Sequence, residues 1–284
     1  MWQLAPSVSI AIWMLVGSAA QAPAPSATLS YRLALQSVIE QRLHQFGGKD
    51  AEREAALKEL FTSVGCGDHL SEQKVSGQRL PNVICTLPGS SDRTIIVGAH
   101  YDHVSAGSGV VDNWSGAALL PSLYQAVNTR PRIHTYIFIG FTAEEQGEIG
   151  SAYYVHHMSK EEVARTDAMI NMDTLGLAPT EVWTSHSDKR LTAALYLLAH
   201  DLKLPISGVN VEQVGSTDSV QFAARKIPSI TIHSLTQQAW NARILHTPSD
   251  RLSAIHLDDY YDTYKLLAAF TAYLDQLPPA STGR

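Results

Sequence analysis

The chain has 284 residues, of which 45% are hydrophobic and 17% are charged, a composition typical of a globular protein that can bury a sizeable core. A formal net charge of -6 and a pI near 6.0 give no basic surface of the kind that binds phosphates, which excludes nucleic acid as an expected partner. The simplest organisation is one domain over residues 29–277, followed by a short tail at 278–284.

The N-terminal segment is apolar and carries no charge before Arg32. Its apolar run, Val8–Val16, is too short to span a bilayer comfortably, and small residues up to Ala20 and Ala22 follow it. This order predicts a secretory signal peptide over residues 1–22 and a leader over 23–28, and hence a secreted or periplasmic protein with no stable membrane insertion after cleavage. A retained membrane anchor or a buried helix are the alternatives, because the usual positive charges at the start are missing.

The next segments predict two helices and a hairpin. Apolar residues recur at helical spacing in Leu29–Phe46 and Ala51–Val64, and Gly47 and Gly48 separate the two helices. A β-hairpin over Val64–Val75 and Leu80–Pro88 would place Cys66 and Cys85 opposite each other. In an exported chain such a pair forms either a disulfide or two free buried thiols, and both readings stay open.

The rest of the chain alternates strands and helices. Continuous apolar runs predict buried strands at 94–99, 134–141, 168–172 and 227–232, and helical spacing predicts helices at 116–127, 191–202 and 257–274. This alternation is typical of an α/β sandwich with a mostly parallel sheet.

Acidic and histidine residues follow these strands directly. His100 comes after the first strand, Glu144 and Glu145 after the second, and Asp173 after the third. In open α/β sheets ligands gather at the carboxyl ends of the strands, so we expect these side chains to converge there.

Two short motifs near the first strand admit a functional and a structural interpretation. His100 can present a ring nitrogen to a ligand while Asp102, two residues on, fixes its tautomer, or it can be a structural histidine. Asp112 precedes Asn113 and a helix that opens with small residues. It is either a helix cap or a carboxylate that bridges two metal ions.

The remaining motifs favour a cation. Adjacent carboxylates at Glu144 and Glu145 repel each other unless a positive charge lies close, although a solvated acidic helix start is the alternative. Together with His100 and Asp112, the residues Glu145, Asp173 and His246 form a set of two histidines and three carboxylates, which suits zinc.

In order and spacing, five motifs resemble the di-zinc exopeptidases of metallopeptidase clan MH, family twenty-eight: Gly98–His103, Asp112–Ala117, Ala143–Gly147, Asn171–Gly176 and His246–Asp250. The resemblance covers the chain from about Val83 to Leu274. It implies a three-layer α/β/α sandwich around a mixed, mostly parallel sheet. It also implies an aminopeptidase, a hydrolase that removes the N-terminal residue of a peptide substrate, although some branches act at the C-terminus.

The resemblance further implies the roles of individual residues. Two zinc ions would be bound, one by His100, Asp112 and Asp173, and the other by Asp112, Glu145 and His246. Glu144 would be the general base, Asp102 would stand behind His100, and the peptide bond between Asp112 and Asn113 would be cis.

Two departures and two alternatives accompany this resemblance. Many relatives have Ser-Asp-His where this chain has Thr217, Asp218 and Ser219, and no tyrosine precedes His246, where Leu245 stands. A glutaminyl cyclase, which uses one zinc ion on the same fold, is the first alternative, although Leu245 occupies the place where a tryptophan would favour it. A non-catalytic binding domain is the second.

The other histidines are interpreted as structural, without acid partners, among them His134. His103 and His233 lie nearer the motifs and are candidates for substrate contact. The sequence leaves the oligomeric state open.

Overall fold

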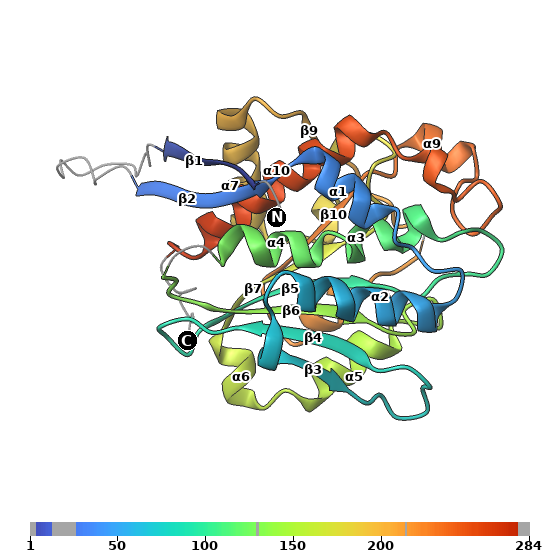
Figure 1. The fold of residues 1–284 in the computed structure, drawn as a ribbon, viewed down its shortest axis with the longest axis horizontal. Coiled ribbons are helices and arrows are strands. Elements are labelled where there is room, and N and C mark those ends of the chain that lie inside the picture. Colours follow the sequence, from blue (N-terminus) through green and yellow to red (C-terminus); the bar gives the residue numbers. More distant parts are fainter. Residues whose placement is uncertain (1–3, 13–26, 129–130, 214, 278–284) are drawn as a thin grey trace.

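The computed structural model describes residues 4–12, 27–128, 131–213 and 215–277 (Figure 1). The predicted cleavage site after Ala20 or Ala22, most of the predicted leader and the tail at 278–284 lie outside the described residues. Within the described part, no helix is long and apolar enough to cross a membrane.

The centre of the fold is an eight-stranded sheet with the order β3-β4-β6-β5-β7-β10-β8-β9. Its strands are β3 Leu70–Gln73, β4 Asn82–Leu87, β5 Thr94–His100, β6 Thr135–Phe141, β7 Thr166–Met172, β8 Thr180–Val182, β9 Ile206–Gly208 and β10 Ser229–His233. The four central strands β6, β5, β7 and β10 run parallel to one another. Three pairs are antiparallel, namely β3 with β4, β4 with β6 and β8 with β10. The predicted mixed, mostly parallel sheet is therefore confirmed.

Helices cover both faces of the sheet, which confirms the three layers (Figure 1). One face carries α1 Gln36–Leu43, α2 Asp50–Ser63, α4 Leu120–Val127, α7 Lys189–Leu202 and α10 Leu257–Leu274; the other carries α5 Ile149–His157, α6 Lys160–Arg165 and α8 Ser219–Ala224. Alternate residues of β5 serve the two cores, since Ile95 and Val97 join the larger cluster and Ile96 the smaller one. A strand that buries both faces reads as a continuous apolar run, which is why β5 was predictable.

The predicted helix over Leu29–Phe46 is wrong in its first half. Ala27–Ala34 forms strand β2, which pairs antiparallel with β1, Leu4–Ile12, and helix α1 begins only at Gln36. The side chains of Leu29, Tyr31 and Leu33 are all buried, so the segment follows the period of two that belongs to a strand. The residues of β1 likewise form a strand and not the buried helix that was one alternative to a signal peptide.

The predicted hairpin is present, and it contains a disulfide. Strands β3 and β4 pair antiparallel, and Cys66 is bonded to Cys85 with their Cα atoms 6.1 Å apart. The two cysteines are not directly opposite each other, as the sequence suggested, because Cys85 pairs with Leu70. Cys66 precedes the 3₁₀ turn Gly67–His69 that leads into β3 and reaches its partner from there.

The remaining elements are short, and the hydrophobic pattern did not reveal most of them. The predicted helix at 116–127 is divided into α3 Ser115–Ala117 and α4. The strands β8 and β9 have three residues each, and α9, Gln237–Asn241, has five, too few for a periodic signal.

Candidate metal centre

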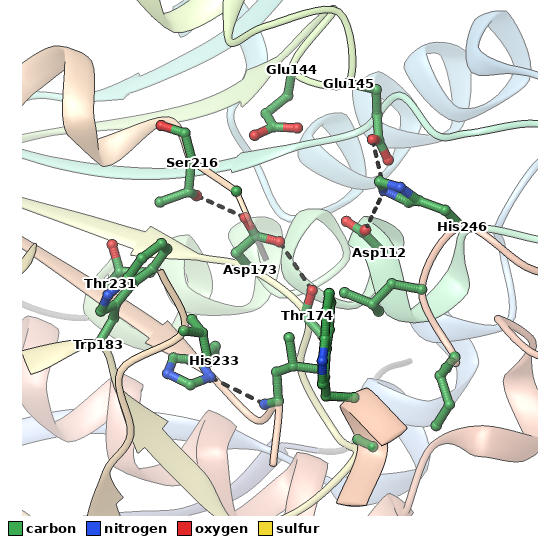
Figure 2. Close-up of a pocket in the computed structure, with 18 of the residues that line it drawn as sticks. Asp112, Glu144, Glu145, Asp173, Thr174, Trp183, Ser216, Thr231, His233 and His246 are labelled. Carbon is green, nitrogen blue, oxygen red and sulfur yellow. Dashed lines mark hydrogen bonds and ion pairs between the residues drawn. The ribbon is translucent and has the colours of Figure 1, made fainter. Parts of the chain in front are cut away.

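Asp112 lies between two imidazoles. Its Oδ1 is 3.3 Å from Nε2 of His100, at the end of β5, and its Oδ2 is 3.2 Å from Nε2 of His246. The loop that carries His246 is far away in sequence but lies over the same end of the sheet (Figure 2). The structure thus brings together the two histidines and the central carboxylate that the sequence singled out.

Three further carboxylates complete the cluster (Figure 2). Asp173 Oδ1 lies 3.6 Å and Glu144 Oε2 lies 3.8 Å from His100 Nε2. Glu145 Oε2 lies 3.0 Å from His246 Nε2. All five predicted ligands and the predicted base therefore face one another.

The ligand atoms that lie within 4.8 Å of one another form two overlapping groups, one of His100, Glu144 and Asp173 and one of His100, Asp112 and Glu145. These groups differ from the ligand sets that the resemblance implies, because Glu144 stands in the first and His246 is absent from the second. The distances are compatible with both assignments of ligands, since Asp112 lies 3.3 Å from His100 and 3.2 Å from His246.

Two glutamates of the cluster have pKa values far above their usual range. Burial, together with the charges of Asp218, Asp173 and Asp112, raises the pKa of Glu144 to about 10. Burial and the charge of Asp112 raise the pKa of Glu145 to about 8. So many buried carboxylates repel one another, and a nearby cation relieves that repulsion.

The surroundings of the two histidines favour the charged form of each ring. Burial works against the charged form of His100, but the carboxylates around it raise its pKa well above the usual value. The contact with Asp112 raises the pKa of His246 to about 9. Burial of Asp112 is outweighed by its contacts with both histidines, which lower its pKa.

Two buried atoms at the centre lack a partner, and this tests whether a metal fits. Among the described residues, neither His100 Nε2 nor Glu145 Oε1 has a hydrogen-bond partner. Buried polar atoms are rarely left unpaired, and an imidazole nitrogen that faces only carboxylate oxygens is arranged as a metal ligand is. The donor set of two imidazoles and three carboxylates suits zinc.

Asp102 makes contacts that the sequence did not suggest. Its carboxylate accepts hydrogen bonds from the backbone N–H of Glu144 at 3.1 Å and of Glu145 at 3.2 Å. His100 Nδ1 lies 3.6 Å from this carboxylate but 3.2 Å from the backbone oxygen of Asp102. Asp102 therefore lies beside His100, but the ring nitrogen is closer to its backbone oxygen than to the carboxylate that was predicted to accept it, and the carboxylate anchors the turn that presents the two glutamates.

The backbone around Asp112 is held by polar contacts. The Asp112–Asn113 peptide bond is cis, as the resemblance implies, and lies in the segment Val110–Trp114, where these two residues have non-helical φ and ψ. Asp250 accepts the backbone N–H of Val111 at 2.8 Å and of Asp112 at 3.1 Å. Asp250 ends the last of the five sequence motifs, but no role could be predicted for it, since a lone carboxylate beside a turn gives no specific signal.

The loop over residues 217–219 now has a defined place. Thr217 Oγ1 accepts a hydrogen bond from Asn171 Nδ2 at 2.6 Å and donates one to Asp173 Oδ2 at 2.7 Å. Asp218 is fully buried, and burial raises its pKa to about 7. Despite its departure from the common Ser-Asp-His pattern, the loop contacts the metal centre through Thr217.

The cluster opens into a cavity of about 890 Å³. Acidic residues of the centre line one part of it, and the other part is largely apolar, with Trp183, Val211, Leu235, Trp240 and Leu245. His233 also lines the cavity, and burial lowers its pKa to about 4. A cavity of this size holds a small ligand or the end of a peptide.

Other histidines differ from their interpretation, since His200 lies 3.3 Å from Asp201 and His256 lies 3.4 Å from Asp259. His134 is not without an acid partner: its Nε2 lies 3.0 Å from Asp167 and its Nδ1 lies 3.3 Å from Asp275. His103 does not line the cavity but contacts Asp50 at 2.7 Å.

Comparison with known proteins agrees with this geometry. Residues 82–271 match the family model "Peptidase family M28". Aminopeptidase YwaD of Bacillus subtilis is 26% identical over 223 residues, which are 73% of this chain and 46% of the relative. Leupeptin-inactivating enzyme 1 of Streptomyces exfoliatus is 29% identical over 176 residues, 61% of this chain and 40% of the relative. The chain thus spans less than half the length of these two relatives.

Solved structures share the fold. The LapA aminopeptidase of Legionella pneumophila superposes with a TM-score of 0.75 at 21% identity, covering 86% of this chain and 72% of LapA. A glutaminyl cyclase from an Acidobacteriales bacterium superposes with a TM-score of 0.72 at 18% identity, covering 91% of this chain and 99% of the cyclase. Because likenesses this distant establish the fold alone, the family assignment rests on the sequence match, which covers most of the chain: this protein belongs to peptidase family M28.

Proposed function

We propose that the chain is a zinc aminopeptidase that hydrolyses the N-terminal peptide bond of peptides, with two zinc ions and Glu144 as the general base. The observation that carries the proposal is the position of Asp112, whose two carboxylate oxygens face the imidazoles of His100 and His246 at 3.3 and 3.2 Å. A carboxylate in this position can bridge two metal ions. The relatives named aminopeptidases support the same reaction.

Five residues would hold the ions. One ion would be held by His100, Asp112 and Asp173, and the other by Asp112, Glu145 and His246. When bound, the ions would supply Lewis-acid chemistry, lowering the pKa of water and polarising the scissile carbonyl group.

Glu144 is placed to move the proton. Its carboxylate lies beside the ligands but not between the two histidines, and its backbone N–H is fixed by Asp102 at 3.1 Å. In this position Glu144 takes a proton from the attacking water and returns it to the leaving amine.

The cavity is suited to the end of a peptide. The carboxylates favour a positively charged α-amine, and the apolar part, with Trp183 and Leu235, can accept a side chain. Confining the amine to the acidic part would restrict cleavage to the N-terminal bond.

A glutaminyl cyclase is the second candidate, because the Acidobacteriales enzyme matches this chain over nearly its whole length. A cyclase would need one zinc ion rather than two. Leu245, where a tryptophan would favour cyclase activity, argues against it.

A single set of measurements separates the two. The purified chain is loaded with zinc, its metal content is determined, and it is assayed with aminoacyl-p-nitroanilides, with dipeptides and with an N-terminal glutaminyl substrate, each with and without a chelator. We expect close to two zinc ions, release of the N-terminal residue and loss of activity on chelation. One zinc ion together with cyclisation of the glutaminyl substrate and no hydrolysis would establish the cyclase, and zinc binding without either reaction would establish a binding domain.

We also propose that the chain is exported. The Cys66–Cys85 disulfide supports this, since structural disulfides persist in oxidising compartments. Fractionation of the source cells tests it: we expect the protein in the periplasm or the medium, and its confinement to the cytosol would contradict the proposal.

A further inference from the structure

Arg53 is a fully buried arginine on α2, outside the segment that matches the family model. Among the described residues, no carboxylate forms an ion pair with it. Its guanidinium instead donates hydrogen bonds to backbone carbonyl oxygens, from Nε to Gly47 at 3.1 Å, from Nη1 to Gly109 at 2.9 Å and Tyr101 at 3.4 Å, and from Nη2 to Ser108. A buried charge is costly unless its hydrogen bonds are satisfied, and these contacts satisfy it.

Three of the four carbonyl groups that Arg53 binds, those of Tyr101, Ser108 and Gly109, lie at the two ends of one loop. Tyr101 follows His100 directly, and Gly109 comes three residues before Asp112. One guanidinium thus joins the beginning and the end of the segment that connects the two residues. Its planar, forked geometry allows it to bind several acceptors at once, which the ammonium of a lysine on a flexible stem does less well.

Neighbouring residues leave room for the guanidinium and bind the same loop. Gly109 has a φ of 55°, and a Cβ atom there would lie 2.9 Å from Arg53 Nη2 and 2.3 Å from the Cβ of His103. Asp50, one turn before Arg53 on α2, accepts hydrogen bonds from the backbone N–H of His103 at 3.2 Å and from its ring at 2.7 Å. Two residues of α2 therefore hold the same loop.

The far side of the loop contacts the last motif. Ser108 N–H donates to the backbone oxygen of Asp250 at 2.7 Å, and Asp250 in turn binds the backbone N–H of Asp112. The loop is therefore fixed between α2 and the turn that follows His246, and its movement would change the position of Asp112 relative to both histidines.

We propose that Arg53 is a positioning residue for the metal centre: by joining the two ends of loop 101–109, it sets the separation of His100 and Asp112 and so the affinity of the centre for zinc. The inference rests on the proposed function, in that it takes the five predicted residues as zinc ligands. Helix α2 would then be required for full metal binding, although it precedes the matched part of the chain.

The test compares Arg53→Lys and Arg53→Met with the unchanged full-length chain. Zinc affinity is measured by competition with a chromogenic chelator, and the ligand geometry by the visible absorption of the cobalt(II)-loaded protein. We expect both variants to bind zinc about 10 to 100 times more weakly and to show an altered cobalt spectrum, as is usual when a contact that orients ligands is lost. Lysine should restore little, because it keeps the charge but not the fork.

Arg42 provides a matched control. It is also a buried arginine of the N-terminal helices, but its guanidinium binds Ser122 and Gln125 of α4 rather than the loop. Arg42→Lys and Arg42→Met should lower the thermal midpoint to a similar degree and leave zinc affinity and the cobalt spectrum unchanged. If Arg42 variants lost zinc equally, the effect of Arg53 would be one of general stability, and the proposal would be wrong.

The remaining outcomes also decide the question. Folded Arg53 variants with the zinc affinity and cobalt spectrum of the unchanged chain would overturn the inference but not the proposed function, whereas failure of the unchanged chain to bind zinc would overturn both. Should neither Arg53 variant fold, Gly109→Ala perturbs the same loop from the other side, because its Cβ would lie too close to both Arg53 Nη2 and the Cβ of His103. It should weaken zinc binding in the same way, and unchanged zinc affinity in that variant would contradict the proposal.

Discussion

The carboxylate of Asp250 accepts the backbone N–H of Asp112 at 3.1 Å, so the turn after His246 fixes the main chain of the central carboxylate of the site. Asp250 is only 2% exposed, and it also accepts the N–H of Val111. Two motifs that lie 138 residues apart in the chain are thereby joined.

Replacement of Asp250 by Ala should therefore destabilise the protein. Two buried N–H groups would lose a charged acceptor, and such groups cost about 1 to 3 kcal/mol each when left unsatisfied. We expect the free energy of unfolding to fall by about 2 to 6 kcal/mol in urea titrations of the metal-free chain. Asp250→Asn, which keeps one acceptor oxygen, should lose less; equal losses in the two variants would show that the hydrogen bonds do not determine the effect.

Glu144→Gln should separate proton transfer from metal binding. The amide keeps the shape of the side chain but cannot accept the proton, so kcat should fall by roughly 10² to 10⁴. Zinc content should stay that of the unchanged chain, because Glu144 is not expected to be a required ligand. The exposed Glu161 on α6 provides the control, and Glu161→Gln should alter neither quantity. A loss of zinc in Glu144→Gln would instead favour the ligand group that includes Glu144.

Much of the fold could be predicted from the sequence because its central strands are buried on both faces. Strands β5 and β6 appear as unbroken apolar runs, and helix α10 has an apolar face over the residues predicted. The N-terminal segment was misread because Leu29 and Leu33, four residues apart, fit a helical period. The alternation of Leu29, Tyr31 and Leu33 is that of a strand, and it ends before helix α1 begins.

The candidate site was predictable for a different reason. Residues such as His100, Glu145 and Asp173 follow strands whose carboxyl ends meet at one edge of the sheet, so position along the chain determines position in space. The contacts of Arg53 and Asp250 could not be predicted in this way. They join loops to distant backbone atoms. Because nearly every residue has a backbone carbonyl and amide, such a hydrogen bond does not depend on which residue stands at the other end.

His134 should make the stability of the protein depend on pH. Burial works against the charge of this imidazole, but Asp275 and Asp167 on either side of it raise its pKa above 6.5. Arg93 and Arg190 also contact this group of residues, Arg93 through the carboxylate of Asp167 and Arg190 through its backbone oxygen. A raised pKa in the folded state means that the charged form stabilises the fold fully below about pH 6.5 and that this contribution is lost as the pH rises through the folded-state pKa.

His134→Gln should accordingly destabilise the protein more at pH 6 than at pH 9, with a loss of about 1 to 3 kcal/mol at pH 6 from the hydrogen bonds to charged partners. Urea titrations at the two pH values, with a chelator present so that zinc does not contribute, measure the difference. The exposed His156 provides the comparison through His156→Gln, which should shift stability little at either pH. Equal destabilisation by His134→Gln at both values would show that the pKa of His134 is not raised in the folded protein.

The disulfide should stabilise the hairpin that forms the edge of the sheet. Cys66 and Cys85 are 19 residues apart, and a cross-link that closes a loop of about this length contributes roughly 3 kcal/mol by restricting the unfolded chain. The double variant Cys66→Ser with Cys85→Ser should lose about that much in urea titrations and keep its zinc content. The single variants allow the loss of the cross-link to be separated from the change of each side chain, and a double variant as stable as the unchanged chain would contradict the prediction.

Asp102 should affect both zinc ions rather than one. From the His-x-Asp spacing alone, Asp102→Asn would weaken only the ion held by His100, Asp112 and Asp173. In the structure the carboxylate of Asp102 also accepts the backbone N–H of Glu144 at 3.1 Å and of Glu145 at 3.2 Å. An asparagine has only one acceptor oxygen, so one of these two amides would lose its partner.

Because Glu145 is a predicted ligand of the second ion, Asp102→Asn should lower the affinity for both ions, by about 10 to 100-fold at the first. Stepwise competition with chelators of increasing strength measures the two affinities, and kcat should recover partly when zinc is added in excess. Asp173→Ala should act differently: it removes a proposed ligand of the first ion only, so the second ion should remain bound. If Asp102→Asn weakened the first ion alone, its contacts with the two glutamate amides would have no part in metal binding, and its role would be limited to the orientation of His100.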